Sequence, residues 1–296
     1  MNNITKEFPG VRALNKMQFD LRRGSIHALI GENGAGKSTL MKVLSGIYTP
    51  ESGTIILDGQ EVKMHSPQDA ESKGVSIVHQ ELAVFGTTTV SENVFTTNPP
   101  KNKLGMIDYK KMHREVRELL DTYGFTDVDE TATLRNLSVG RQQLIEILRA
   151  VKKNAKVLIL DEPTAVLTLQ ETEKLFAVLR NMKEAGKAIV IITHKLHEVL
   201  SLSNRVAVLR KGEYIDTVKT SEATEESLTE MMVGKKVELN IERSQPKDPQ
   251  ERLTVTGLTS VNDEGRRVLD DVSFTAHSGE ILGIAGIAGS GQRELL

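Results

Sequence analysis

Residues 31–39 are the stretch of this chain whose types and spacing point most directly to chemistry. They read G-E-N-G-A-G-K-S-T and match the phosphate-loop spacing G-x-x-x-x-G-K-[ST]. A glycine-rich backbone can surround a triphosphate with N–H donors at close range, because little side-chain bulk intervenes. Lys37 is placed to neutralise the β- and γ-phosphates, and the Ser38 hydroxyl to bind Mg²⁺. We therefore predict a nucleotide site made of Gly31, Glu32, Asn33, Gly34, Ala35, Gly36, Lys37, Ser38 and Thr39.

Two adjacent carboxylates follow the apolar run 157–160, which predicts a buried strand. Asp161 can bind Mg²⁺ beside a phosphate loop, together with Ser38. Glu162 points elsewhere and can orient or deprotonate a water molecule, which is typically worth ~10²–10⁴-fold in rate. A solvated Asp-Glu turn is the alternative, and the apolar strand before the pair favours the catalytic interpretation.

Three further residues stand where a nucleotide site of this kind could use them. Gln80 and His194 follow predicted strands, and open α/β sheets place their ligands at strand ends. His194 is a candidate γ-phosphate sensor, whereas Gln80 by itself fits a solvated loop as well as a metal shell. Phe8 lies in a turn ahead of the loop and either stacks on adenine or anchors a first hairpin. The other histidines are expected to be structural or on the surface, at positions 27, 65, 79, 113, 197 and 277.

Residues 137–143, L-S-V-G-R-Q-Q, predict the start of a second helix whose N-terminus could bind an anion. Ser138 by itself predicts an ordinary helix N-cap. Gly140 adds a second cluster of accessible backbone N–H groups. The sequence thus carries two helix starts suited to phosphate.

The elements around these residues alternate between strand and helix. Apolar residues 26–30 predict a strand before the phosphate loop, and residues 40–44 continue a helix whose positive end favours an anion. This alternation predicts an α/β fold with a mostly parallel sheet flanked by helices. Residues 81–136 interrupt it and predict a mainly helical insertion, with one helix from residue 108 to about 123.

The overall composition is that of a globular protein of one or two domains. The chain has 296 residues, with 38 basic and 40 acidic side chains, so its net charge does not favour nucleic acid. It has no cysteine, which excludes disulfides, thiolate catalysis and Cys-ligated metals. Its longest apolar runs fall short of the ~20 residues of a membrane helix. Residues 1–7 lack the apolar core of a signal peptide.

The chain repeats itself after a polar linker. We predict a first domain at 1–234, a linker at 235–251 and the start of a second domain at 252–296, which leads us to expect a truncated chain. Lys37 and Ser38 correspond to Gln292 and Arg293, so the second phosphate loop is degenerate. The residues that recur at a constant offset are Leu14, Phe19, Gly24, Gly31 and Gly36, matched by Leu269, Phe274, Gly279, Gly286 and Gly291.

Taken together, these motifs resemble those of ATP-binding cassette (ABC) ATPases. The sequences F-P-G-V at 8–11, H-Q-E-L at 79–82 and D-E-P-T-A-V-L-T at 161–168 look like the duplicated ATPase subunits of simple-sugar importers, of the ribose, galactose or xylose class. A nucleoside-importing branch is similar. The resemblance implies a P-loop NTPase core with an antiparallel β subdomain, and it covers the first domain entirely and the second only at its start.

The resemblance also implies roles for individual residues. Two cassettes would sandwich ATP, with Glu162 activating water and His194 holding the γ-phosphate. Arg141 and Thr168 depart from the glutamine and aspartate usual in the family. The metal would be held by Ser38, Gln80 and Asp161. The signature segment contacting ATP across the interface would be Ser138, Val139, Gly140, Arg141 and Gln142.

The expected function is an ATPase that energises monosaccharide import, with ATP and Mg²⁺ as cofactors. The implied partners are transmembrane permease subunits, a solute-binding protein and a second ABC domain, with no nucleic acid. The insertion around 82–120 would transmit the motion to the permease, at the cytoplasmic face of the cell membrane. The alternatives are a nucleoside importer, a tandem ABC ATPase of translation or DNA repair, and a non-catalytic relic.

Overall fold

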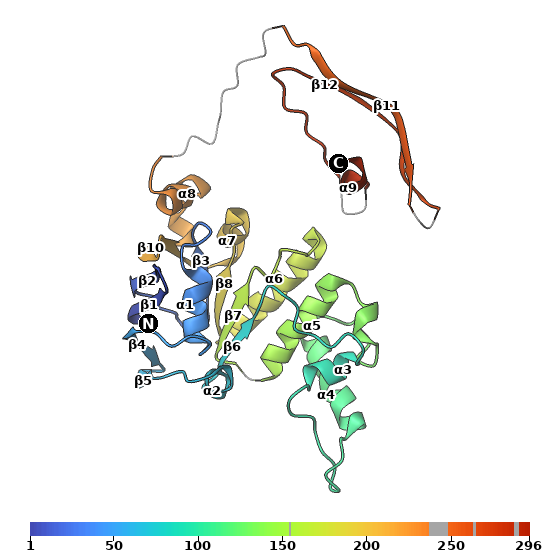
Figure 1. The fold of residues 1–296 in the computed structure, drawn as a ribbon. Helices are drawn as coiled ribbons and strands as arrows, with labels where there is room; N and C mark the ends of the chain where they lie inside the picture. Colours follow the sequence, from blue (N-terminus) through green and yellow to red (C-terminus); the bar gives the residue numbers. More distant parts are fainter. Residues whose placement is uncertain (154, 237–247, 263–264, 287–289) are drawn as a thin grey trace. The chain divides into compact units, whose positions relative to one another are not determined.

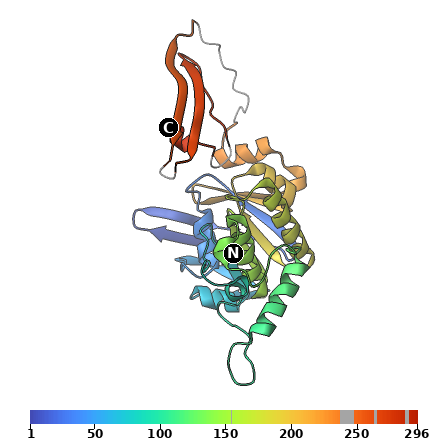
Figure 2. The same ribbon diagram turned by 90° about the vertical axis from the view of Figure 1, so that its right-hand side faces the viewer.

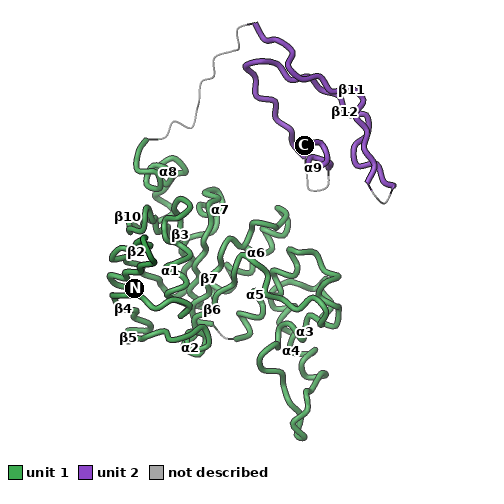
Figure 3. Tube along the Cα trace, viewed as in Figure 1, with its two compact units in different colours: residues 1–237 green, residues 238–296 purple. Residues whose placement is uncertain are grey.

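The computed structural model describes residues 1–153, 155–236, 248–262, 265–286 and 290–296. The chain divides into two compact units, Met1–Val237 and Glu238–Leu296 (Figure 3). No helix within the described residues is long and apolar enough to cross a membrane.

A six-stranded sheet forms the centre of the first unit, in the order β10-β9-β3-β8-β7-β6. Its strands from β9 to β6 are parallel and β10 alone pairs antiparallel, which confirms the mostly parallel sheet predicted from the alternation. Every residue of β3 and β8 is buried, as expected for strands covered on both faces. The strands are β3 (Ser25–Ile30), β6 (Val75–Val78), β7 (Val157–Asp161), β8 (Ala188–Ile192), β9 (Arg205–Arg210) and β10 (Glu213–Lys219).

Helices cover both faces of this sheet (Figure 1). Alternate residues of β7 belong to two different hydrophobic cores. Leu158 and Leu160 pack with α5 (Val139–Lys152) and α6 (Leu169–Glu184), whereas Val157 and Ile159 pack with α1 (Lys37–Leu44). This follows from the two-residue period of a strand. The helices around the sheet are α1 (Lys37–Leu44), α2 (Pro67–Ser72), α6 (Leu169–Glu184), α7 (Leu196–Leu202) and α8 (Glu225–Val233), with the 3-10 turn η2 (Thr220–Glu222) before α8.

A separate four-stranded sheet packs beside α1 with the order β2-β1-β4-β5, all antiparallel. It is the antiparallel β subdomain that the family resemblance implied. Its strands are β1 (Asn2–Phe8), β2 (Val11–Met17), β4 (Ser52–Leu57) and β5 (Gln60–Val62).

The helical insertion lies across the large sheet from this small sheet (Figures 1 and 2). Its elements are α3 (Val90–Val94), α4 (Tyr109–Thr122) and η1 (Leu134–Asn136), and α5 (Val139–Lys152) follows it. The predicted helix from residue 108 is confirmed, because the Asp108 side chain caps α4 by accepting a hydrogen bond from Lys111 N.

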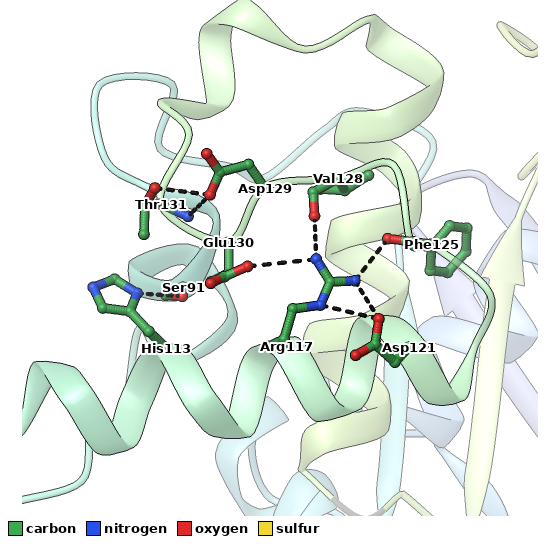
Figure 4. Close-up of polar contacts among 9 residues, drawn as sticks. All are labelled: Ser91, His113, Arg117, Asp121, Phe125, Val128, Asp129, Glu130 and Thr131. Atoms are coloured by element: carbon green, nitrogen blue, oxygen red, sulfur yellow. Dashed lines mark hydrogen bonds and ion pairs between the residues drawn. The ribbon is translucent and has the colours of Figure 1, made fainter.

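Arg117 ties α4 to the loop that leads toward η1 and α5 (Figure 4). Its guanidinium donates to the carbonyl oxygens of Val128 and Phe125, at 2.7 and 3.1 Å, and pairs with Asp121 at 2.6 Å. A further contact at 3.4 Å reaches Glu130. One forked, permanently charged side chain therefore fixes the whole loop 125–130 on α4.

The second unit is a long hairpin followed by a short helix: β11 (Glu251–Val261), β12 (Arg267–His277) and α9 (Gln292–Leu295). Gly291, directly before α9, has surroundings like those of Gly36, directly before α1. A Cβ on Gly36 would meet Ala13 O at 2.8 Å, and one on Gly291 would meet Val268 O at 2.6 Å, with Leu14 and Leu269 the next neighbours. This likeness supports the predicted repeat. Most of the predicted linker, residues 237–247, lies outside the described residues, and the domain boundaries stay a prediction.

His27 is a fully buried histidine in the middle of β3, and neither ring nitrogen has a hydrogen-bond partner among the described residues. Burial lowers its pKa to about 4; Asp20 opposes this shift, and Arg205 and Arg22 add to it. The neutral ring is therefore the form that the folded chain accommodates.

We predict that acid weakens the fold through this side chain. Between pH 6.5 and about 4 the unfolded chain binds a proton at His27 that the folded chain does not, so the free energy of unfolding falls by up to about 3 kcal/mol as the pH falls. Urea titrations across this range measure the slope. His27→Phe should flatten it, and an unchanged slope in that variant would contradict the assignment.

Candidate nucleotide-binding site

The phosphate loop runs from the end of β3 to the start of α1, and its first and last glycines have no room for a side chain. A Cβ on Gly31 would lie 2.3 Å from Leu209 O, and Gly36 caps α1 with a φ of +98°. Gly34 has a φ of +80° with open space around it. Close packing on one side and open backbone on the other leave the loop's interior available to a ligand.

A cavity of about 520 Å³ opens over this loop, within the size range of small-molecule sites. The ends of β3, β6, β7 and β8 meet there, since parallel strands place their carboxyl ends at one edge of a sheet. The cavity brings together ten of the predicted residues: Asn33, Gly34, Ala35, Gly36, Lys37, Ser38, Thr39, Gln80, Asp161 and Glu162.

Lys37 holds its ammonium against its own loop. It donates to the carbonyl oxygens of Gly31 and Glu32, at 2.8 and 3.0 Å. Burial lowers its pKa, and the charges of Glu162 and Asp161 act in the opposite direction. The positive charge is thus held where a phosphate entering the loop would meet it.

The residues proposed to hold the metal offer a suitable donor set. Ser38, Gln80 and Asp161 all line the cavity and carry oxygen atoms, the ligands that Mg²⁺ prefers. Burial, and then the charge of Glu162, raise the pKa of Asp161. A divalent cation beside Asp161 would favour its charged form, so the site fits Mg²⁺.

Glu162 is held by both backbone and side-chain contacts. Its backbone N–H donates to Ile192 O at 2.9 Å, and its φ of +47° lies in the left-handed region. Its Oε1 lies 3.0 Å from Nδ1 of His194, which is mostly exposed. The strained turn and the histidine together fix the direction of this carboxylate at the cavity wall.

A buried polar cluster behind this pair was missed by the sequence analysis. Thr164 Oγ1 donates to Glu198 Oε2 at 2.6 Å, and both residues are buried. Lys195 Nζ bonds Thr164 O at 3.0 Å and pairs with Glu198 at 3.1 Å. The cluster joins the segment after Glu162 to the segment after His194. A signal was present, because Glu198 lies on the apolar face of α7, beside Val199 and one turn from Leu202.

The predicted signature residues lie at the start of α5 and do not line the cavity. Ser138 caps the helix by accepting from Arg141 N, and its hydroxyl donates to Glu171 Oε1 at 3.0 Å. A Cβ on Gly140 would come within 2.4 Å of the Glu171 carboxyl, so this carboxylate lies directly over the helix start. Arg141 pairs with Asp127 at 2.6 Å. The contacts of Val139 and Gln142 also stay away from the cavity: Val139 is exposed, and Gln142 Nε2 donates to Leu137 O.

Phe8 is not among the cavity residues. Its ring packs edge-on against Tyr48, with centroids 5.2 Å apart. The same hairpin instead contributes Val11, Arg12 and Ala13 to the cavity, and the turn between β9 and β10 contributes Lys211 and Gly212. The sequence analysis missed these five, because their position depends on how two distant hairpins meet the loop. The adenine role of Phe8 stays a prediction.

Comparison with known proteins identifies the family. Residues 14–165 match the family model described as ABC transporter. The Streptomyces avermitilis protein named Ribose import ATP-binding protein RbsA 1 is 45% identical over 296 residues, which are 100% of this chain and 55% of that protein. A putative ribose/galactose/methyl galactoside import ATP-binding protein of Agrobacterium fabrum is 44% identical, over 98% of this chain and 56% of its own length. The chain thus spans a little more than half the length of the curated relatives it matches.

Solved structures agree on the fold. A nucleotide-free ATP-binding cassette from an ABC transporter aligns with a TM-score of 0.67 at 24% identity, over 78% of this chain and 93% of that one. A dimeric cassette bound to ADP and Pi aligns with a TM-score of 0.63 at 22% identity, over 74% and 97%. The first unit therefore has the P-loop NTPase fold of these cassettes, and the chain belongs to the ABC transporter family.

Proposed function

We propose that this chain binds and hydrolyses ATP to energise the import of a monosaccharide. The observation that carries the proposal is that Lys37, Asp161 and Glu162 line the same cavity, with His194 bonded to Glu162. The names of the ribose and galactose import relatives support the choice of substrate class. A nucleoside-importing ATPase is the alternative within the same family.

Each side chain has a definite task in this mechanism. Lys37 leaves the carbonyl oxygens of its own loop for the β- and γ-phosphates, gaining a charge-assisted contact. Ser38, Gln80 and Asp161 would hold Mg²⁺, which would supply charge neutralisation for the phosphates. Glu162 accepts the proton of the attacking water. His194 orients that carboxylate through Nδ1 and presents its other nitrogen toward the γ-phosphate.

A second ABC domain completes the site in this proposal. Val139, Val166 and Leu169 are exposed apolar side chains on the signature helix and on the segment after Glu162. Such a cluster on one part of a protein surface suits a contact with another domain. The start of α5 would then meet the γ-phosphate of the neighbour, which requires the Glu171 carboxylate to move off Ser138. The second domain is either a further part of a longer chain or another copy.

The other partners follow from the same proposal. Transmembrane permease subunits and a solute-binding protein would choose the sugar, and the ATPase would lie peripherally at the cytoplasmic face of the membrane. The helical insertion would pass the closing motion on to the permease. The competing non-transport class, a tandem ATPase of translation or DNA repair, lacks support in the balanced charge of the chain.

Removing the catalytic carboxylate should separate binding from turnover. Glu162→Gln keeps the shape and loses the base, so we expect unchanged ATP affinity and a kcat lower by ~10²–10⁴-fold. A fluorescent ATP analogue measures the affinity, and phosphate release measures the rate. Glu173→Gln, an exposed glutamate on α6, is the matched control and should behave as the parent. Normal hydrolysis by Glu162→Gln would disprove the base assignment.

Removing the phosphate-loop lysine should instead weaken binding itself. A charged hydrogen bond is worth ~1.5–3 kcal/mol, so the Kd of Lys37→Ala for ATP should rise between about tenfold and 150-fold. Isothermal titration compares it with Lys42→Ala, which lies on the same helix but does not line the cavity. Equal affinities for the two variants would count against the site.

Co-purification tests the transport class. We expect the full-length relative of this chain, expressed with its neighbouring permease genes, to be recovered with permease subunits in detergent. Recovery with ribosomes or DNA instead would favour the non-transport alternative.

A further inference from the structure

A short ordered hairpin protrudes from the first unit just before α4 (Figures 1 and 2). We call residues 101–109 the hairpin tip. Lys101 and Ile107 form an antiparallel bridge, and Asn102 N donates to Met106 O at 2.8 Å. The Asn102 side chain also accepts from Leu104 N and Met106 N, at 2.9 and 3.1 Å. The tip is therefore held in one shape by its own backbone contacts.

This fixed shape presents large apolar side chains to solvent. Leu104 is 81% exposed, and Met106, Tyr109 and Ile107 are 58%, 50% and 41% exposed. Among the described residues, a ring contact of Tyr109 with His113 covers one of the four only in part, and exposed apolar clusters of this kind mark interaction sites.

The charges beside the apolar side chains are almost all positive. Lys101, Lys103, Lys110 and Lys111 lie in or next to the tip, whereas the chain as a whole is balanced. The one carboxylate among them, Asp108, is engaged in capping α4. The partner of this surface should therefore be both anionic and able to accept apolar groups.

A lipid surface fits this combination better than a protein surface. Lysine is depleted in the cores of protein interfaces, whereas its apolar stem and charged head suit the boundary between acyl chains and headgroups. Tyrosine is likewise favoured at that boundary. We propose that the hairpin tip binds the anionic lipid surface of the membrane, with Leu104 and Met106 inserted and the lysines at the headgroups.

This proposal extends the peripheral location proposed above and does not depend on hydrolysis. A chain that fails to bind lipid can still be the importer ATPase, and a chain that binds lipid can lack turnover. The two proposals are therefore tested by separate measurements.

Vesicle sedimentation of the whole chain tests the surface. We expect salt-sensitive binding to vesicles of equal parts phosphatidylglycerol and phosphatidylcholine, and little binding to phosphatidylcholine alone.

Lys103→Gln and Lys110→Gln should each weaken binding about fivefold, because one lysine at an anionic surface is worth ~1 kcal/mol. Leu104→Ser with Met106→Ser should weaken it at least about tenfold. Ile56→Ser and Lys63→Gln, which alter exposed residues away from the tip, should bind as the parent does.

A fluorescence probe reports insertion directly, since the chain has no tryptophan. The emission of Tyr109→Trp should shift to the blue with anionic vesicles, and that of Ile56→Trp should not.

Parent-like binding by the tip variants, equal binding to neutral vesicles, or an unshifted Tyr109→Trp spectrum would each overturn the proposal. Loss of permease co-purification by tip variants that still bind vesicles normally would also overturn it, since the tip would then contact protein.

Discussion

The parallel pairing of β9, β3, β8, β7 and β6 is the constraint on which the site depends. In such a sheet all carboxyl ends point the same way, so the segments that follow the strands must meet at one edge. The phosphate loop follows β3, and Asp161 closes β7. Residues separated by more than a hundred positions thereby share one cavity, although nothing in the sequence around either one indicates the other.

At this edge of the sheet, a positively charged lysine lies near two negatively charged carboxylates. Lys37 is partly buried near two carboxylates, and burial raises the pKa of Asp161. The Lys37 ammonium donates to loop carbonyl oxygens, and the Glu171 carboxylate accepts from the hydroxyl of Ser138, the residue that caps α5. Both contacts involve groups that a triphosphate would take over. Hydrogen bonds within the chain therefore hold these donors in position at the site.

Glu162 and the segments that follow Glu162 and His194 are held by several contacts. Glu162 stands on a left-handed backbone position, which costs of order 1–3 kcal/mol and persists only where surrounding contacts enforce it. Those contacts are the bond to Ile192 O and the buried cluster of Thr164, Lys195 and Glu198. The buried Glu198 carboxylate is paired by Thr164 and Lys195, and losing either partner would leave a buried charge uncompensated. The cluster joins the segment after His194 to the segment after Glu162.

The sequence by itself determined the phosphate loop, the carboxylate pair, the alternation that builds the parallel sheet and the helix from residue 108. These features depend on short-range spacing: glycines where side chains do not fit, apolar runs with a strand period, and an acidic cap before a helix. Only the tertiary structure decided which hairpins complete the cavity, that Phe8 packs on Tyr48, and that Glu198 joins the segments after Glu162 and His194. Those contacts join residues far apart in the chain, and they depend on how sheets and helices pack, which no local pattern of residue types records.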